Sequence, residues 1–222
     1  LDIKNLNDKV YQNQKKNQIF IPNSQKIDNS LVELYTIDNF LNDFECQEVI
    51  KITKKYSKES TVVNYSSDRN TSNWRTSLTC HLNDINENKE IISKINQKIC
   101  LTINIEDTFS EPIQAQYYQV GKQFKPHTDY FDPGTNINDV ELKGNRTWTF
   151  MIYLNDVKIG GETHFPIINK SIKPKRGMAL IWNNNDLNGK PNYNTLHQGM
   201  PPIEGEKYII TKWFRQKSLV NK

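Results

Sequence analysis

Hydrophobic positions recur with two different periods along this 222-residue chain, and the change of period separates a helical part from a strand-rich part. From residue 38 onward, apolar side chains recur three and four positions apart, which predicts a helix over about 43–57 with Asn42 or Asp43 as its N-cap. The same spacing, carried mainly by isoleucines, predicts a second helix over about 87–101. Helices are therefore expected in the first half of the chain.

Short apolar runs separated by glycine, proline and asparagine dominate the second half. They lie at residues 113–120, 147–154, 162–165, 178–182 and 208–214. Many short strands with turn signals between them are typical of an antiparallel sandwich or barrel, and a jelly roll fits their number. We therefore expect a mainly β fold with flanking helices (α+β). Its double-stranded β-helix, or jelly-roll, core would span about 110–216, with the N-terminal helices packed on one sheet.

Two polar stretches follow neither period. Residues 1–30 are rich in Asn, Gln and Lys around one apolar cluster of Ile19, Phe20 and Ile21, which predicts a polar N-terminal arm that docks by a few residues. Residues 64–73 have almost no apolar content and predict an exposed loop. The length and the 36% hydrophobic content fit one core, so we expect a single domain over 31–218 after the arm.

Charge and composition exclude several classes of protein. The net charge of +4 is modest and the lysines are scattered, so nucleic-acid binding is not favoured. The longest apolar runs are too short to span a bilayer, so no membrane span is expected. The chain begins at Leu1 without an initiator Met, so we expect a processed or trimmed chain. A signal peptide or membrane anchor that was removed from its N-terminus is compatible with this expectation. Two locations stay open, the endoplasmic reticulum lumen and the cytoplasm of a host cell.

The three cysteines, Cys46, Cys80 and Cys100, are odd in number, far apart in sequence and free of Cys-x-x-Cys spacing. This pattern predicts neither a disulfide framework nor a zinc site. Free thiols are expected, with one disulfide as the alternative.

The tripeptide His127-Thr128-Asp129 is the clearest chemical feature of the chain. In an extended segment alternate residues face the same side, so His127 and Asp129 are predicted to project together from one short strand. His197 follows 197 − 127 = 70 residues later, and a jelly roll brings such distant strands into facing sheets. Two imidazoles and one carboxylate can hold one face of an octahedral iron(II) and leave the other open. Alone, His-x-Asp is more often a hydrogen-bonded surface pair, so its interpretation depends on neighbouring motifs.

Lys207 is the first of these neighbours. It opens the apolar run 207–214, where alternation places it on one face with Ile209, Thr211 and Trp213. Burial of its ammonium there would be costly without an anionic partner. Non-haem iron oxygenases bind a 2-oxo acid whose distal carboxylate needs such a cation, so Lys207 is a candidate partner for that carboxylate. The alternative, a strand-end lysine whose head reaches solvent, is left open by the periodicity.

Four sequence blocks follow one another in order. They are 117–131 (YYQVGKQFKPHTDYF), 146–157 (RTWTFMIYLNDV), 160–166 (GGETHFP) and 197–208 (HQGMPPIEGEKY), the last followed by TKW at 211–213. Together they resemble the ordered motifs of the prolyl 4-hydroxylase family of Fe(II)- and 2-oxoglutarate-dependent dioxygenases. The resemblance spans about residues 38–215, almost the whole chain.

The resemblance implies roles for six residues at the metal and the co-substrate. The three implied iron ligands are His127, Asp129 and His197, and the three residues implied to hold 2-oxoglutarate are Lys207, Tyr118 and Thr163. Lys207 would pair with the distal carboxylate, aided by the two hydroxyls. The implied activity is that of a procollagen-proline 4-dioxygenase-like oxidoreductase. It uses Fe(II), 2-oxoglutarate and O2, hydroxylates peptidyl proline at C4 and releases succinate and CO2, with ascorbate as a further cofactor.

The resemblance also implies a substrate side, formed by Arg146, Trp213 and Arg75, although core packing is an equal interpretation of Trp213. The segments 61–73 and 130–145 are the loops expected to close the pocket. Two positions depart from the family pattern. Phe124 stands where many relatives have Tyr, and Arg215 stands close to the substrate side where His is frequent. Both departures bear on which peptide is chosen rather than on the reaction.

Two other classes of function remain as alternatives. One is a 2-oxoglutarate oxygenase that acts on another protein residue or on nucleic acid, and the other is a non-catalytic jelly-roll binding module. Lys207 counts against the first because those enzymes commonly use arginine there, and the complete ligand set counts against the second. The expected partner is a proline-containing peptide or protein. The identity of that target and the oligomeric state stay open.

Overall fold

The structure is a computed structural model that describes residues 21–60 and 74–219. Within these residues the largest element is an eight-stranded antiparallel sheet. In spatial order its strands are β1 (Gln25–Lys26), β2 (Leu34–Ile37), β11 (Ala179–Asn183), β7 (Arg146–Tyr153), β14 (Lys207–Arg215), β5 (Gln114–Tyr118), β4 (Leu78–His81) and β3 (Lys58–Glu59).

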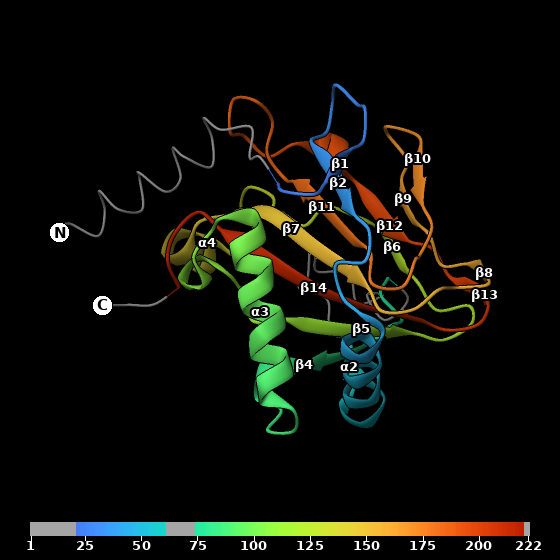
Figure 1. The fold of residues 1–222 in the computed structure, drawn as a ribbon. Helices are drawn as coiled ribbons and strands as arrows, with labels where there is room; N and C mark the ends of the chain where they lie inside the picture. The colour runs from blue at the N-terminus through green and yellow to red at the C-terminus, as the bar shows by residue number, and fades with distance from the viewer. Residues whose placement is uncertain (1–20, 61–73, 220–222) are drawn as a thin grey trace.

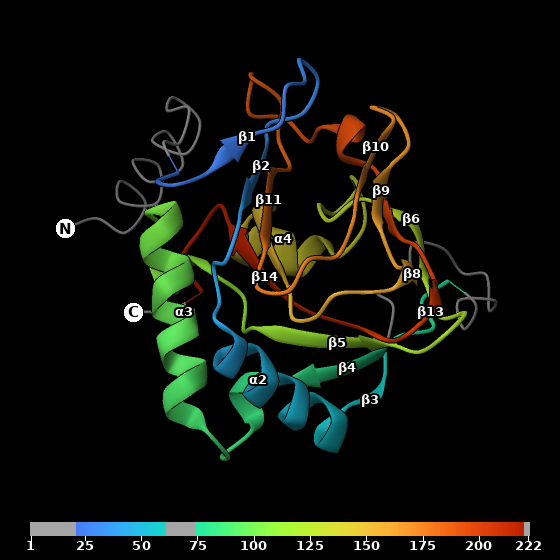
Figure 2. The same cartoon turned by 45° about the vertical axis from the view of Figure 1, so that its right-hand side comes forward.

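A four-stranded sheet lies opposite the middle of the large one (Figure 2). Its order is β10 (Lys170–Ile172), β9 (Thr163–Phe165), β12 (His197–Gly199) and β6 (Phe124–His127). A two-stranded ribbon, β8 (Ile159–Gly160) with β13 (Pro202–Glu204), extends one end of the molecule. The two facing antiparallel sheets confirm the predicted jelly roll.

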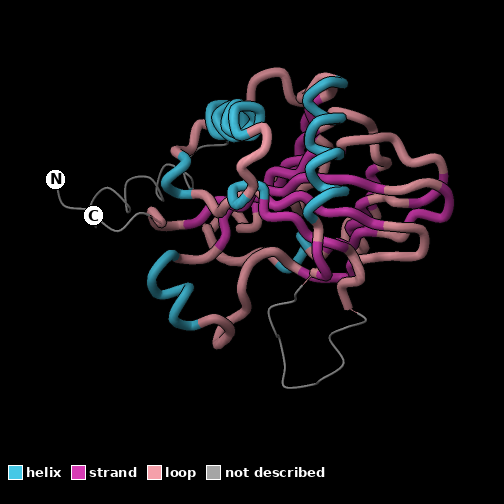
Figure 3. Tube along the Cα trace, turned by 90° about the horizontal axis from the view of Figure 1, so that it is seen from below, coloured by secondary structure: helices cyan, strands magenta, loops and turns pink. Residues whose placement is uncertain are grey.

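The longer helices, α2 (Asp43–Tyr56) and α3 (Lys89–Ile103), lie beside the large sheet (Figure 1), and in the view from below the strands lie together with helices around them (Figure 3). A capping box starts α2, because Asn42 accepts from the Glu45 amide and Glu45 accepts from the Asn42 amide. The predicted helix at 43–57 and its Asn42 cap are thus confirmed, and the second helix is displaced by two residues from 87–101. A short helix, α4 (Ile137–Lys143), follows β6.

Two apolar clusters hold these layers together, and alternation along the central strands assigns side chains to them. On β7, Phe150 and Ile152 pack with the helices, whereas Met151 and Tyr153 pack between the two sheets. This arrangement confirms that the N-terminal helices cover one sheet. It also leaves the space between the sheets as the place where inward-facing polar side chains meet.

Short elements are where the structure departs from the sequence interpretation. The segment 130–145, interpreted as a loop, contains α4. The strands β2, β4 and β12 have four residues or fewer, too few for a clear alternation, and were not predicted. In the predicted arm, Ile21 is buried and β1 pairs with β2, so its end docks on the sheet. The rest of the apolar cluster and the predicted loop at 64–73 lie outside the described residues.

One prediction from composition, that of free thiols, is borne out in the described part of the chain. All three cysteines are free thiols, with Cys46 and Cys80 buried. None of the described helices combines the length and apolar character needed to cross a bilayer.

Candidate active site

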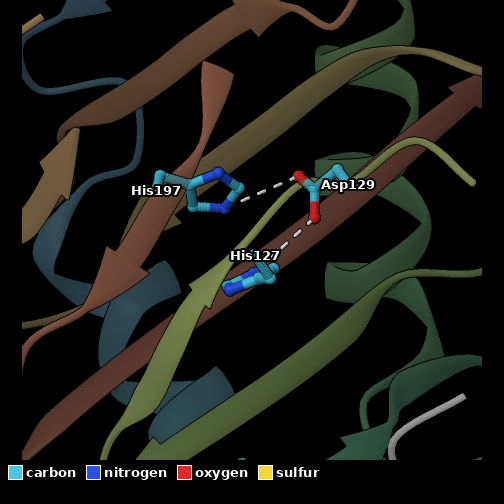
Figure 4. Close-up of side chains that lie close together, drawn as sticks. All are labelled: His127, Asp129 and His197. Carbon is cyan, nitrogen blue, oxygen red and sulfur yellow. Dashed lines mark ion pairs between the residues drawn. The ribbon is translucent and has the colours of Figure 1, made fainter. Parts of the chain in front are cut away.

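His127, Asp129 and His197 converge between the two sheets (Figure 4). The histidines are register partners on the paired strands β6 and β12, and Asp129 follows in a bend after β6. Nε2 of His127 lies 3.9 Å from Oδ1 of Asp129, and Nε2 of His197 lies 3.9 Å from Oδ2. The three ligand atoms lie within 4.8 Å of one another, a spacing at which one metal ion can bind all three.

This geometry corrects two details of the prediction. The ligand pair does not lie on one strand, because β6 ends at His127 and the chain bends at Asp129. His197 does not come from a facing sheet either, since β12 is the hydrogen-bonded neighbour of β6. The expectation that the three residues meet is correct, although adjacent strands rather than opposed ones bring them together.

Backbone carbonyls fix the orientation of both imidazoles. His127 Nδ1 lies 2.7 Å from the Lys125 carbonyl oxygen, and His197 Nδ1 lies 2.9 Å from that of Thr195. A carbonyl only accepts hydrogen bonds, so each Nδ1 carries the proton and each Nε2 presents its lone pair to the centre of the site. This is the tautomer that a metal ligand requires.

The charge state of the site also suits a cation. Burial, reinforced by neighbouring His197, lowers the pKa of His127 to about 3, so its ring is neutral at neutral pH. Burial alone would raise the pKa of Asp129, but the two histidines, Arg146 and the hydroxyl of Thr149 lower it on balance. The neutral imidazole of His127, the imidazole of His197 and one carboxylate form a donor set that fits iron(II) and leaves coordination positions open.

A buried chain of hydrogen bonds holds the carboxylate of Asp129. Thr149 donates to Oδ2 of Asp129 at 2.6 Å, and Asn184 donates to Thr149 at 2.9 Å. The indole of Trp182 donates to Asn184 at 3.0 Å. Sequence reasoning missed this support, although Thr149 stands at a motif position of the block 146–157. Such outer partners orient metal ligands and tune their affinity.

Lys207 occupies a chamber beside this triad. Its side chain is 1% exposed, which excludes the alternative of a lysine that reaches solvent. Among the described residues its ammonium has no hydrogen-bond or ion-pair partner, and it lies 5.2 Å from the ring centroid of Tyr118 and 5.6 Å from that of Tyr153. Burial lowers the pKa of Lys207 to about 7, opposed in part by Glu162. A buried cation without a carboxylate partner is a site prepared for an anion.

Tyr118 and Thr163 line the same chamber, as predicted. The Tyr118 hydroxyl donates to Gln116 Oε1 at 2.9 Å, and Tyr153 donates to Thr163 Oγ1 at 2.7 Å. Because the Thr163 oxygen already accepts one hydrogen bond, its own proton can turn toward a ligand. Sequence reasoning missed Tyr153, although this residue too stands at a motif position of the block 146–157.

A larger groove of about 540 Å³ opens on the other side of the metal triad. All three predicted substrate residues, Arg75, Arg146 and Trp213, line it. His127, Asp129 and Trp213 line both the groove and the chamber, so the two cavities meet at the triad. The arrangement therefore allows one molecule in the chamber and another in the groove to reach the same metal ion.

The groove walls combine aromatic rings with cations. Trp213 lies 4.0 Å from the Arg146 guanidinium carbon, and Arg75 lies 5.0 Å from the ring centroid of Phe124. Phe124, one of the two departures from the family pattern, stacks on His127 with ring centroids 3.5 Å apart. Arg215, the other departure, lies close to the substrate side, with its guanidinium carbon 5.0 Å from the ring centroid of Phe131, which lines the groove. It is 2% exposed and does not line the groove.

Comparison with known proteins adds an independent line of evidence. The sequence model of the 2OG-Fe(II) oxygenase superfamily matches residues 113–215. The chain is 32% identical to probable prolyl 4-hydroxylase 6 of Arabidopsis thaliana in an alignment 203 residues long that covers 82% of the chain and 69% of that protein. It is 29% identical to prolyl 4-hydroxylase subunit alpha-1 of Homo sapiens over 201 residues, which is 90% of the chain but only 37% of that protein.

A solved structure agrees with these sequence relatives. The fold is similar to viral collagen prolyl hydroxylase vCPH from Paramecium Bursaria Chlorella virus-1, solved as a 2OG complex. The TM-score is 0.62 and the sequence identity 28%, and the match covers 82% of this chain and 95% of that one.

Proposed function

The chain belongs to the prolyl 4-hydroxylase family of 2OG-Fe(II) oxygenases, and on this premise we propose that it hydroxylates peptidyl proline at C4. The co-substrates are 2-oxoglutarate and O2, and the products are 4-hydroxyproline, succinate and CO2. One observation carries the proposal. A metal-ligand triad lies between a chamber that contains a buried lysine with no ion-pair partner among the described residues and a groove of about 540 Å³ lined with aromatic rings.

The triad supplies the iron site. Bound iron(II) would activate oxygen in a step coupled to the oxidative decarboxylation of 2-oxoglutarate. His127, Asp129 and His197 would hold one face of the ion and leave the opposite positions to the co-substrates. The carbonyl contacts of both Nδ1 atoms and the hydroxyl of Thr149 keep the three ligand atoms oriented before the metal arrives. Ascorbate is the proposed reductant that keeps the iron divalent.

Lys207 supplies the counter-charge for 2-oxoglutarate. Its ammonium would pair with the distal carboxylate, with the hydroxyl of Thr163 as a further donor and that of Tyr118 as another once its proton turns away from Gln116 Oε1. Because Lys207 and the triad both line one narrow chamber, a dicarboxylate bound at the lysine would extend toward the three metal ligands. The lysine thereby selects for an acid with a second carboxylate.

The groove supplies the peptide site. Arg75, Arg146 and Trp213 would contact a proline-containing segment whose target carbon lies over the open face of the metal. The rings of Phe124 and Phe131 line the same wall and help to exclude water from the reacting atoms. The substrate class that we propose is a proline-containing peptide or protein, with Gly-x-Pro repeats among the first to test.

Mass spectrometry of proline peptides tests the proposal directly. The enzyme is incubated with iron(II), 2-oxoglutarate and ascorbate, and with Gly-x-Pro repeats, other proline-rich peptides and proline-free versions of each. The expected result is one added oxygen atom on proline in the wild type and none in Asp129→Ala. Consumption of 2-oxoglutarate with no oxygen on any proline would move the target to another residue or to nucleic acid. Absence of iron-dependent 2-oxoglutarate binding would instead favour the non-catalytic module.

A further inference from the structure

Behind the groove wall, two arginines share one largely buried carboxylate. Arg146 donates to both oxygens of Glu111, through Nε to Oε1 at 2.7 Å and through Nη2 to Oε2 at 2.7 Å. Arg215 donates to Oε1 of the same group at 2.8 Å. The side chains of Glu111 and Arg215 are 16% and 2% exposed. Charge-assisted hydrogen bonds in such surroundings fix the positions of all three groups.

An aromatic ring links the same two arginines. The ring centroid of Phe131 lies 4.9 Å from the guanidinium carbon of Arg146 and 5.0 Å from that of Arg215. Trp213 covers Arg146 at 4.0 Å. Phe131, Arg146 and Trp213 line the groove, whereas Arg215 does not. We call these four side chains and Glu111 the wall cluster. Arg215 therefore supports the surface of the groove from behind, without lining the groove itself.

Arg215 also anchors the segment that carries α4. Its Nε and Nη2 donate to the Gly144 carbonyl at 2.9 and 2.6 Å, and Nη2 donates to Asp139 Oδ2 at 2.7 Å. None of the α4 side chains is buried, so the helix has little apolar packing of its own. Arg215 thus connects the end of β14, the α4 segment and the groove wall through one planar, multidentate group, which a lysine cannot imitate.

We propose that Arg215 is a positioning residue of the substrate groove, which holds Phe131 and, through Glu111, Arg146 in place for the peptide. The inference rests on the proposed function, because it assigns Arg215 to recognition of the same peptide. Arg215 contacts neither the metal ligands nor the co-substrate chamber. Its loss should therefore weaken binding of the peptide equally in the ground state and the transition state, which raises KM and leaves kcat unchanged.

Steady-state kinetics of Arg215→Lys is the central experiment. We expect the peptide KM to rise about tenfold, the scale of one lost charged hydrogen bond, while kcat changes less than about twofold. The KM for 2-oxoglutarate and its consumption without peptide should equal the wild-type values. A fall in kcat or in peptide-free consumption would overturn the proposal, because Arg215 would then act on the whole site. An unchanged peptide KM would overturn it as well.

Two further variants on α4 make the test specific. Asp139→Asn removes one partner of Arg215 and should raise the peptide KM by about threefold. Lys143 pairs with the same carboxylate at 2.7 Å but makes no hydrogen bond or ion pair with the wall cluster. Lys143→Met is therefore the matched control and should leave the peptide KM unchanged. Should Arg215→Lys not fold, Asp139→Asn carries the test, and equal KM values for Asp139→Asn and Lys143→Met would overturn the proposal.

If the proposed function itself is wrong, the same experiment gives a different result. It shows in the wild type, as 2-oxoglutarate consumption without oxygen on any proline. Hydrogen exchange does not require a substrate, and Arg215→Lys should accelerate exchange over residues 137–145 but not over β12. Unchanged exchange over 137–145 would refute the anchoring role of Arg215 whatever the substrate is.

Discussion

The affinity for 2-oxoglutarate should depend on pH through Lys207. In the free protein, burial lowers the pKa of this lysine to about 7 from the ordinary 10.5. That difference corresponds to roughly 5 kcal/mol less stabilisation of the ammonium than in water. A dicarboxylate that places one carboxylate against Lys207 stabilises its ammonium, and therefore raises the pKa of Lys207 in the complex.

The sign of the pH dependence follows from these two pKa values. Below about pH 7, Lys207 is charged both in the free protein and in the complex, so the affinity for 2-oxoglutarate does not change with pH. Above that pH, Lys207 is deprotonated in the free protein but protonated in the complex. Binding of 2-oxoglutarate is therefore accompanied by uptake of one proton. The affinity should fall about tenfold for each pH unit until the pKa of the complex is reached. At pH 8 we expect uptake of about 0.9 proton for each 2-oxoglutarate bound.

Lys207→Met removes the cation while keeping an apolar side chain of similar length. Loss of a buried charge partner typically costs about 3 kcal/mol, which predicts roughly a hundredfold weaker binding of 2-oxoglutarate below pH 7. The variant should also lose the pH dependence, so that its affinity approaches that of the wild type at high pH. Iron affinity should not change, because Lys207 lies outside the ligand set.

Isothermal titration calorimetry measures each of these quantities. 2-Oxoglutarate is titrated into manganese(II)-loaded protein under nitrogen from about pH 6 to 9.5, in buffers of different ionisation enthalpy that report proton uptake. Lys212→Met is the matched control, since Lys212 lies on the same strand with its ammonium 2.9 Å from Asp107 on the helix-covered side. A wild-type affinity that is flat across this range would refute the reasoning, as would a Lys207→Met variant that keeps the pH slope.

Five further substitutions test the metal site and the fold. His127→Ala should abolish turnover and the rise in melting temperature on adding manganese(II), whereas a retained thermal shift would exclude His127 as a ligand. Thr149→Val should weaken metal binding about tenfold in a chelator competition, and Thr149→Ser should restore it, because the lost group is the donor to Asp129. Gly177→Ala should lower the free energy of unfolding in urea by more than about 2 kcal/mol, since its φ is +73° and an added Cβ would lie 2.2 Å from a backbone carbonyl. Gly134→Ala, with φ +86° and no atom within 4 Å of an added Cβ, should cost only about 1 kcal/mol, and equal losses at both positions would contradict the steric argument.

Local patterns made part of the fold predictable. Alternation along 207–214 placed Lys207 on one face with Ile209 and Thr211, and the structure has all three on the chamber side of β14. The capping box at Asn42 likewise depends on residues three apart in sequence. Both signals are contained within one element, so no knowledge of distant partners was needed.

Elements that depend on distant partners were missed for the same reason. The seven residues of α4 bury no side chain, and the segment is attached through Asp139 and Gly144 to Arg215, more than 70 residues away. The pairing of β6 with β12 depends on strands of four and three residues with a shifted register, too short for periodicity to reveal. Glu111, between a 3-10 turn and β5, carries no sequence signal for the two arginines it binds.

The same distinction separates the metal site from the groove wall. Each ligand histidine is oriented by the carbonyl two residues before it, Lys125 in β6 for His127 and Thr195 just before β12 for His197, so the local chain around each ligand sets its tautomer. The wall cluster instead depends on side chains from three distant segments, joined through one carboxylate. A substitution in the wall can therefore change the fit of a peptide while both imidazoles keep their orientation. On this argument we expect Arg215, the departure from the family pattern that belongs to the wall cluster, to affect substrate choice without loss of the iron chemistry.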